Sequence, residues 1–237
     1  MSNPPSPIDT ASRRRISTAL AAAGSGSAQH RLCATCALLV GTSGAAIAVV
    51  SETGHRAVLC SSNAAAGAIE DLQVILGEGP GVDAHRLGVP VTAADLATAG
   101  SSRWLAFCAP AIDAGAAAVF AFPLRLGGIQ LGTLTFNNDH AGRLPDAQYA
   151  DALLIVGIVT ESVLSLQAKA PRGTVAAALE ALASDSAEVH QAAGMLAVRL
   201  GVGVAEALVR LRARAYVDGR SLADLARAVV GGREEVV

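Results

Sequence analysis

Three segments near the C-terminus place apolar residues at steps of three and four, which is the spacing of one face of an α-helix. The first covers residues 188–200 and ends at Gly201, a residue type that commonly follows a helix. The second covers residues 204–215. The third opens with Ser221, and Asp224 stands three residues later, as in a capping box. Short helices bury their stripes only against one another, so this region predicts a compact three-helix bundle.

The period of the apolar residues changes repeatedly before this bundle. The expected order is a helix at 29–40, strands at 45–51 and 56–61, a helix capped by Asn63 and ending near Leu76, an irregular stretch at 84–96 with a short strand at 89–91, a short helix at 101–109, strands at 116–125 and 130–137, and a long helix at 146–169. Pro123 lies inside one strand and favours an edge position or a bulge. This order predicts an α+β domain in which helices flank an antiparallel sheet.

We therefore expect four parts in the chain. Residues 1–28 are rich in Pro, Ser and Asn and form a disordered or short helical extension. Residues 29–168 form the sheet domain, residues 169–187 a linker helix capped by Thr174, and residues 188–233 the bundle. Helices on either side of the linker are candidates for a coiled coil with a second subunit, which predicts a homodimer.

The charge of the bundle differs from that of the whole chain. Between residues 188 and 233, seven arginines against four acids leave a net charge of +3, although the chain as a whole carries −2. Arg212 and Tyr216 lie one helical turn apart on one flank, and Arg210 and Arg214 lie on the opposite, solvated flank. An aromatic ring beside guanidinium groups suits the loops of single-stranded RNA. The alternative is that the arginines are a solvated helix face and the tyrosine a packing edge.

The C-terminal motifs resemble the ANTAR domain, the RNA-binding antitermination module of bacterial response regulators. They are Gln191–Leu196 (QAAGML), Ala207–Arg212 (ALVRLR), Ala215 and Leu222–Ala226 (LADLA). The resemblance implies binding of a two-hairpin leader RNA that otherwise forms a terminator. The RNA-binding candidates are Gln191, Arg199, Arg210, Arg212, Arg214, Tyr216 and Arg220. Family members usually carry Lys where this chain has Ala193 and often Phe where it has Leu208, so we expect one cation fewer on the RNA face.

The upstream domain resembles the GAF domain over about residues 29–167. The residues that carry this likeness are Leu76–Pro80, Pro90-Val91 before Asp95-Leu96, Arg103-Trp104, Gly115–Leu124 and Leu131–Leu134. The resemblance implies a small-molecule or redox sensor or a dimer scaffold, and GAF followed by ANTAR is a known bacterial arrangement of the actinobacterial type. Glu78, Arg103 and Trp104 are candidates for a ligand pocket, and the alternative is that they tie loops to the sheet. The Asn-Lys-Phe-Asp-Glu pattern of cyclic-nucleotide GAF domains is not apparent.

The four cysteines are Cys33, Cys36, Cys60 and Cys108. Cys33 and Cys36 form a C-x-x-C on a predicted helix, without the second ligand pair that a zinc site needs. We interpret all four as small buried residues of a reducing compartment, with a redox or iron–sulfur sensor as the alternative. No metal or cofactor is expected.

Function follows from these expectations. An enzyme such as a thiol-dependent reductase would use Cys60 and Cys108, but no Cys–His pairing is evident, so we predict no catalysis. No apolar run reaches ~20 residues and no secretory signal is visible, so we expect no membrane contact and a cytoplasmic protein. The sequence predicts an RNA-binding antitermination regulator with leader RNA and a small-molecule effector as partners. The alternative is a GAF-based sensor whose bundle mediates protein contacts or dimerisation.

Overall fold

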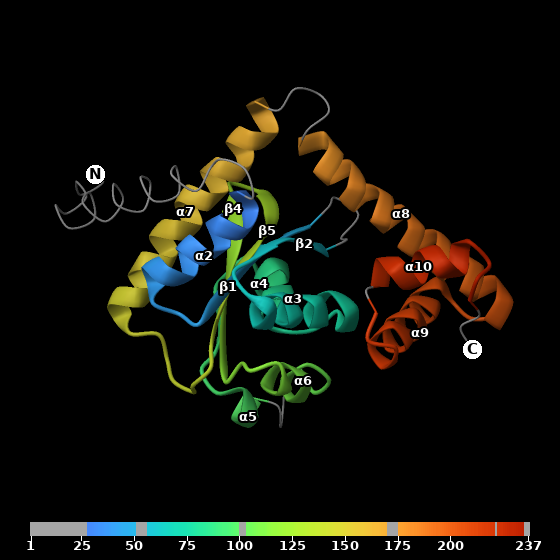
Figure 1. Cartoon of the computed structure of the whole chain (residues 1–237), viewed down its shortest axis with the longest axis horizontal. Coiled ribbons are helices and arrows are strands. Elements are labelled where there is room, and N and C mark those ends of the chain that lie inside the picture. The colour runs from blue at the N-terminus through green and yellow to red at the C-terminus, as the bar shows by residue number, and fades with distance from the viewer. Residues whose placement is uncertain (1–27, 51–55, 100–102, 170–174, 221, 235–237) are drawn as a thin grey trace.

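The computed structural model describes residues 28–50, 56–99, 103–169, 175–220 and 222–234. In these ranges an antiparallel sheet with helices on both faces is followed by three helices that lie to one side of it (Figure 1). The expectations for residues 1–27 and for Ser221 lie outside the described residues. The α+β sheet domain and the C-terminal helices are confirmed.

The sheet has five strands in the order β2-β1-β5-β4-β3, and all neighbours are antiparallel. The strands are β1 (Gly44–Val50), β2 (Arg56–Ser61), β3 (Val91–Ala93), β4 (Ala118–Leu126) and β5 (Ile129–Asn138). Gly127 adopts φ +58° in the tight turn between β4 and β5, a conformation that glycine takes at little cost. Both predicted hairpins are therefore present, although the tip of the first lies among residues that are not described.

Alternate residues of β4 face the two layers of helices. Phe120, Phe122 and Leu124 pack with α2 (Ala28–Val40) and α7 (Asp146–Lys169). Val119 and Ala121 belong to the other core, with residues of α3 (Ala64–Leu76), α4 (Pro80–Leu87), α5 (Leu96–Ala99) and α6 (Cys108–Asp113). A strand buried on both faces needs apolar residues at every position, and β4 has them up to Leu124.

Two sequence expectations between the hairpins are wrong. Residues 84–87, which we expected to be irregular, belong to α4, because Pro80 suits the first turn of a helix and Gly88 ends it with φ +68°. The short helix expected at 101–109 lies at 108–113 instead. Trp104 takes the left-handed φ of +55°, and its buried indole donates a hydrogen bond to Asp83 Oδ2 at 3.0 Å. A residue in the left-handed conformation cannot belong to a right-handed helix, so the expected helix is interrupted at Trp104.

Pro123 occupies the position that its chemistry predicts. β3 pairs only with Val119–Ala121 of β4. Pro123 lies beyond this pairing, at a position where that side of β4 is a sheet edge. A bulge follows between Leu124 and Arg125.

The C-terminal helices are α8 (Val175–Leu200), α9 (Val204–Val217) and α10 (Leu222–Val230). α8 is continuous, so the expected linker helix and the first bundle helix are one element. The predicted three-helix bundle is confirmed, and Ile75 at the end of α3 belongs to the same buried cluster as the bundle core. The bundle thus packs against the sheet domain through α3 and α9.

Candidate nucleic-acid interface

The bundle core fixes which side chains point to solvent. Leu196, Leu211, Leu225 and Val229 are fully buried at its centre, one or two from each helix. Gly201 ends α8 with φ +66°, so the chain reverses within a few residues into α9. The charged residues between these apolar positions are left on the outside.

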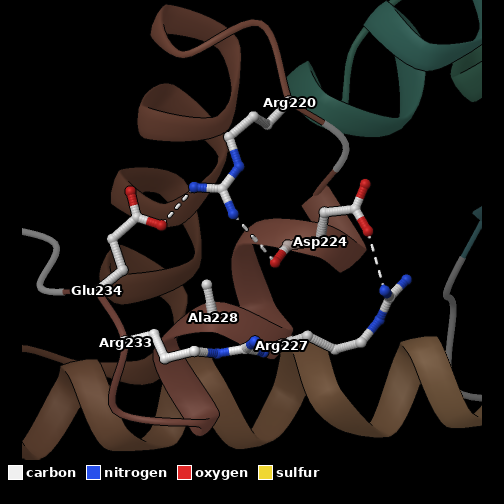
Figure 2. Close-up of a pocket in the computed structure, with 6 residues that line it drawn as sticks. All are labelled: Arg220, Asp224, Arg227, Ala228, Arg233 and Glu234. Carbon is white, nitrogen blue, oxygen red and sulfur yellow. Dashed lines mark hydrogen bonds and ion pairs between the residues drawn. The ribbon is translucent and has the colours of Figure 1, made fainter.

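Arginines gather around α10, on the helix itself and on the chain before and after it. Arg220, Arg227 and Arg233, with Asp224 and Glu234, line a shallow hollow of about 560 Å³ (Figure 2). Arg220 Nη1 donates to Glu234, and Arg227 Nη1 lies 2.9 Å from Asp224 Oδ1. We call Arg214, Arg220, Arg227 and Arg233 the arginine surface, because Glu234 also acts electrostatically on Arg214.

Two of the predicted arginines form ion pairs with acidic residues of α9 or of its C-cap. Arg210 Nη2 lies 2.6 Å from Glu206 and Arg214 Nε lies 2.7 Å from Asp218. The hydrogen bond to Asp218 raises the pKa of Arg214, so this side chain stays charged. Exposed pairs of this kind contribute little to stability, because water and salt screen them. An RNA phosphate can therefore compete with these carboxylates.

Arg212 differs from the other arginines because it packs against the sheet domain. A Cβ built on Gly77, which ends α3 with φ +65°, would lie 2.9 Å from Arg212 Nη1. The end of a helix carries partial negative charge, which favours a cation there. Burial lowers the pKa of the guanidinium, and its buried Nε has no hydrogen-bond partner among the described residues. Such an unpaired group costs ~1–3 kcal/mol.

Arg212 and its predicted neighbour therefore have different surroundings, although they lie on one helix. Tyr216 lies one turn further along α9 and is 43% exposed. A base can reach the tyrosine ring, but the guanidinium beside it is engaged by α3. Gln191 and Arg199 are both exposed on α8.

Position 193 corrects one expectation. Ala193 is 1% exposed, so it lies in the interior and not on an RNA face. The presence of Ala instead of Lys at this position therefore does not remove a positive charge from the exposed surface. Sequence reasoning also left Arg227 and Arg233 out of the candidates, although Arg227 stands on the polar side of the α10 stripe. That position is the signal that could have identified it.

The three ligand-pocket candidates hold a loop in place. Arg103 Nη2 and Trp104 Nε1 donate to Asp83 Oδ2 at 2.6 and 3.0 Å, and the Arg103 guanidinium lies 4.3 Å from the indole centroid. Glu78 Oε1 accepts hydrogen bonds from the backbone N–H of Ala106 and Phe107 at 2.7 and 2.9 Å, just before α6. These contacts match the loop-tying alternative. Ligand binding by Glu78, Arg103 and Trp104 stays a prediction.

The cysteines depart from the sequence interpretation. Cys33 of α2 is disulfide-bonded to Cys60 of β2, so these two are not the free thiols that we expected. The sequence hides this pair because α2 and β2 meet only in the fold. Cys36 and Cys108 are free and buried, burial raises the pKa of Cys36 to about 12, and burial with the charge of Glu78 raises that of Cys108. Neither is an activated thiolate.

Two features are absent from the described ranges. There, no three His, Cys, Asp or Glu side chains gather into a group able to hold a metal ion. None of the helices described has the length and apolar character needed to cross a membrane.

Comparisons with known proteins agree with this division of the chain. Residues 177–230 match the family model of the ANTAR domain. The GAF domain of a phosphoenolpyruvate-protein phosphotransferase from Acinetobacter is 12% identical, with a TM-score of 0.51 over 70% of this chain and 99% of that chain. The corresponding GAF domain from Coxiella burnetii is 14% identical, with a TM-score of 0.49 over 68% and 95%. At this identity the likeness shows the fold alone. No curated protein matches the sequence.

Proposed function

Because the chain carries an ANTAR domain behind a domain of GAF fold, we propose that it is an RNA-binding transcription antitermination regulator in which the GAF domain controls the bundle. The match over residues 177–230 carries this proposal. The exposed arginines on the same three helices support it.

The mechanism is a competition between two base-pairings of one leader RNA. Terminator and antiterminator exclude each other, so a protein that binds only the two-hairpin form raises the population of that form. The shift equals the difference in binding free energy between the two forms. The bundle needs no catalytic group for this task.

Each candidate residue has a stated role in this complex. Arg199, Arg210, Arg214 and Arg220 contact phosphates, and Arg227 and Arg233 extend that surface. Tyr216 stacks on an unpaired loop base, and Gln191 donates to or accepts from a base edge. One bundle offers one hairpin site, so a homodimer matches an RNA with two hairpins.

Control arises from the contact between α3 and α9. While Arg212 lies at the end of α3, it contributes nothing to an RNA surface. A change in the GAF domain that releases α9 adds this guanidinium beside Tyr216. RNA affinity then follows the fraction of molecules in the released form.

A gel-shift titration tests the proposed function. The full chain is titrated against a two-hairpin RNA and against an unstructured RNA of equal length. Arg212→Ala combined with Tyr216→Ala should abolish the shift of the two-hairpin RNA while the circular dichroism spectrum stays that of the folded protein. Arg143→Ala, an exposed arginine of the sheet domain, is the matched control and should leave the shift unchanged. Equal affinity of the double variant and the wild type contradicts the proposed surface.

A second candidate function is protein binding by the bundle. Val198, Val209 and Val217 are 87%, 61% and 78% exposed on α8 and α9, and exposed apolar side chains are common in protein interfaces. A bundle that forms only protein contacts gives no salt-sensitive RNA shift, so the same titration separates the two functions.

A further inference from the structure

The chain after α10 turns back over the hollow of the arginine surface. Gly232 follows the helix with a φ of +66°, which lets the chain reverse its direction. The N–H of Arg233 then donates to the carbonyl of Ala228 at 2.9 Å, so the reversed chain is fixed on the helix. The next residue is Glu234, and its carboxylate meets Arg220, which reaches over from the chain before α10 (Figure 2).

The pair of Arg220 and Glu234 is open to solvent. The two side chains are 36% and 23% exposed, so a solute can reach both. Nη1 of Arg220 donates to the carboxylate of Glu234, and Nη2 donates to the backbone carbonyl of Asp224 at 3.4 Å. Glu234 is the only carboxylate among the described residues that pairs with this guanidinium.

The carboxylate of Glu234 lies where a phosphate oxygen would bind. Carboxylates and phosphates both present anionic oxygens that the fork of guanidinium N–H groups binds in the same way. The charge of Glu234 also acts on a second arginine. It helps to raise the pKa of Arg214, after the larger effect of the hydrogen bond from Arg214 to Asp218. Two guanidinium groups of the arginine surface therefore interact with this one carboxylate.

The other carboxylate of the hollow has a different effect. Asp224 pairs with Arg227 at 2.9 Å, and Nε of Arg227 also lies 3.1 Å from Oε2 of Glu188. That oxygen is buried and accepts no hydrogen bond among the described residues, so it depends on the nearby charge of Arg227. Arg227 therefore stays engaged when the charge of Asp224 is removed. Arg220, in contrast, loses its carboxylate partner when the charge of Glu234 is removed.

We propose that Arg220, with Arg214 beside it, is a phosphate-binding subsite and that Glu234 occupies this subsite until a phosphate displaces it. The step from phosphate to RNA rests on the proposed function. The competition lowers the affinity for every polyanion by the same factor, because each must displace the same carboxylate. RNA that also contacts the other arginines and Tyr216 compensates for this loss, whereas a polyanion without those contacts does not.

An RNA titration of the full chain tests the role of Glu234. Glu234→Gln keeps the size of the side chain and removes its charge, so it should bind the two-hairpin RNA about three- to fivefold more tightly than the wild type, as the loss of one exposed ion pair allows. Asp224→Asn removes the same charge from the same hollow and is the matched control. It should raise affinity less than about twofold, because Arg227 keeps Glu188 as a partner. Equal gains in the two variants indicate a general effect of charge and overturn the subsite.

A double-mutant cycle assigns the effect to Arg220. Arg220→Gln removes the subsite, so the addition of Glu234→Gln to this variant should change RNA affinity by less than about 1.5-fold. A gain that persists in the Arg220→Gln background shows that Glu234 acts on the whole surface through space, and it overturns the proposal. Circular dichroism checks that each variant is folded, which we expect because both side chains are partly exposed.

Inorganic tripolyphosphate separates the subsite from the proposed function. In isothermal titration calorimetry it should bind Glu234→Gln about threefold more tightly than the wild type, and this difference should vanish in the Arg220→Gln background. A protein that behaves in this way but shifts no RNA retains the subsite and loses the antitermination function. An RNA shift that is equal for the wild type and Glu234→Gln retains the proposed function and overturns the competition. No difference in either titration, or no binding of either probe, overturns the subsite.

Discussion

Arg212 Nη1 lies 2.9 Å from the position that a Cβ on Gly77 would occupy. Gly77 ends α3 in the left-handed conformation, and Arg212 lies at the middle of α9. The contact therefore joins the C-cap of a sheet-domain helix to a predicted RNA-binding side chain. The φ of +65° favours glycine here, and an added methyl would displace the flexible end of Arg212.

Gly77→Ala should release the bundle. The added methyl meets the guanidinium, and the left-handed conformation costs an alanine ~1–2 kcal/mol. If docking weakens by ~1.4 kcal/mol, the apparent RNA affinity rises about tenfold, measured by fluorescence anisotropy. Gly88→Ala is the matched control, because Gly88 has φ +68° at the end of α4 and its Cβ would meet Arg125 instead. Equal RNA affinities of the two variants would show that the α3–α9 contact does not control binding.

The arginine surface should set the salt dependence of RNA binding. Arg227→Ala with Arg233→Ala removes two cations from the hollow in Figure 2. Each lost phosphate contact makes the negative slope of log K against log salt shallower by ~0.7 to 0.9. The slope of the double variant should therefore be shallower by ~1.4 to 1.8 than that of the wild type. A salt series from low to physiological concentration measures this, with Arg143→Ala as the unchanged control. An unaltered slope places the RNA on another face of the bundle.

The disulfide should contribute to stability. Cys33 and Cys60 are 27 residues apart in the sequence, and closing a loop of this length stabilises a protein by ~2–4 kcal/mol. Urea unfolding with and without reductant should show this loss in the free energy of unfolding. Cys33→Ala with Cys60→Ala should behave like the reduced wild type and should no longer respond to reductant. A reductant effect that persists in this variant excludes the disulfide as its cause.

Cys36 should be unreactive in the folded protein. Its pKa of about 12 leaves ~10⁻⁴ of the thiol ionised at pH 8, and only the thiolate reacts. Alkylation followed by mass spectrometry should therefore label Cys36 in denaturant and leave it unlabelled in the folded chain. Burial raises the pKa of Cys36 above its ordinary 9.0, so the unfolded chain loses the thiol proton at lower pH than the folded chain does. The free energy of unfolding therefore falls as the pH rises above 9.0. Rapid labelling of the folded chain at pH 8 contradicts this burial.

Local periodicity and capping predicted much of the fold. Asn63 caps α3 by accepting the N–H of Ala66, as its position before an apolar helix indicated. Pro123 predicted the bulge beside it. The three apolar stripes at the C-terminus predicted the bundle, because each stripe is buried against helices that are close to it in the sequence. These features depend on interactions close in the sequence.

Contacts between distant residues were beyond such reasoning. Helical spacing placed Arg212 on a flank of α9, but no local signal indicated that the end of α3 would cover that flank. The Cys33–Cys60 bond and the left-handed Trp104 likewise depend on partners that only the fold brings close. The candidate site was therefore found by residue type, and its division into exposed and docked arginines required the structure.

Crosslinking of the protein to RNA in cells, followed by sequencing of the bound RNA, tests the central claim most directly. The proposed function predicts enrichment of leader transcripts that can form two adjacent hairpins overlapping a terminator, and loss of this enrichment in the Arg212→Ala, Tyr216→Ala variant. Recovery of no RNA above that variant, or of RNA without paired hairpins, would contradict antitermination by this protein.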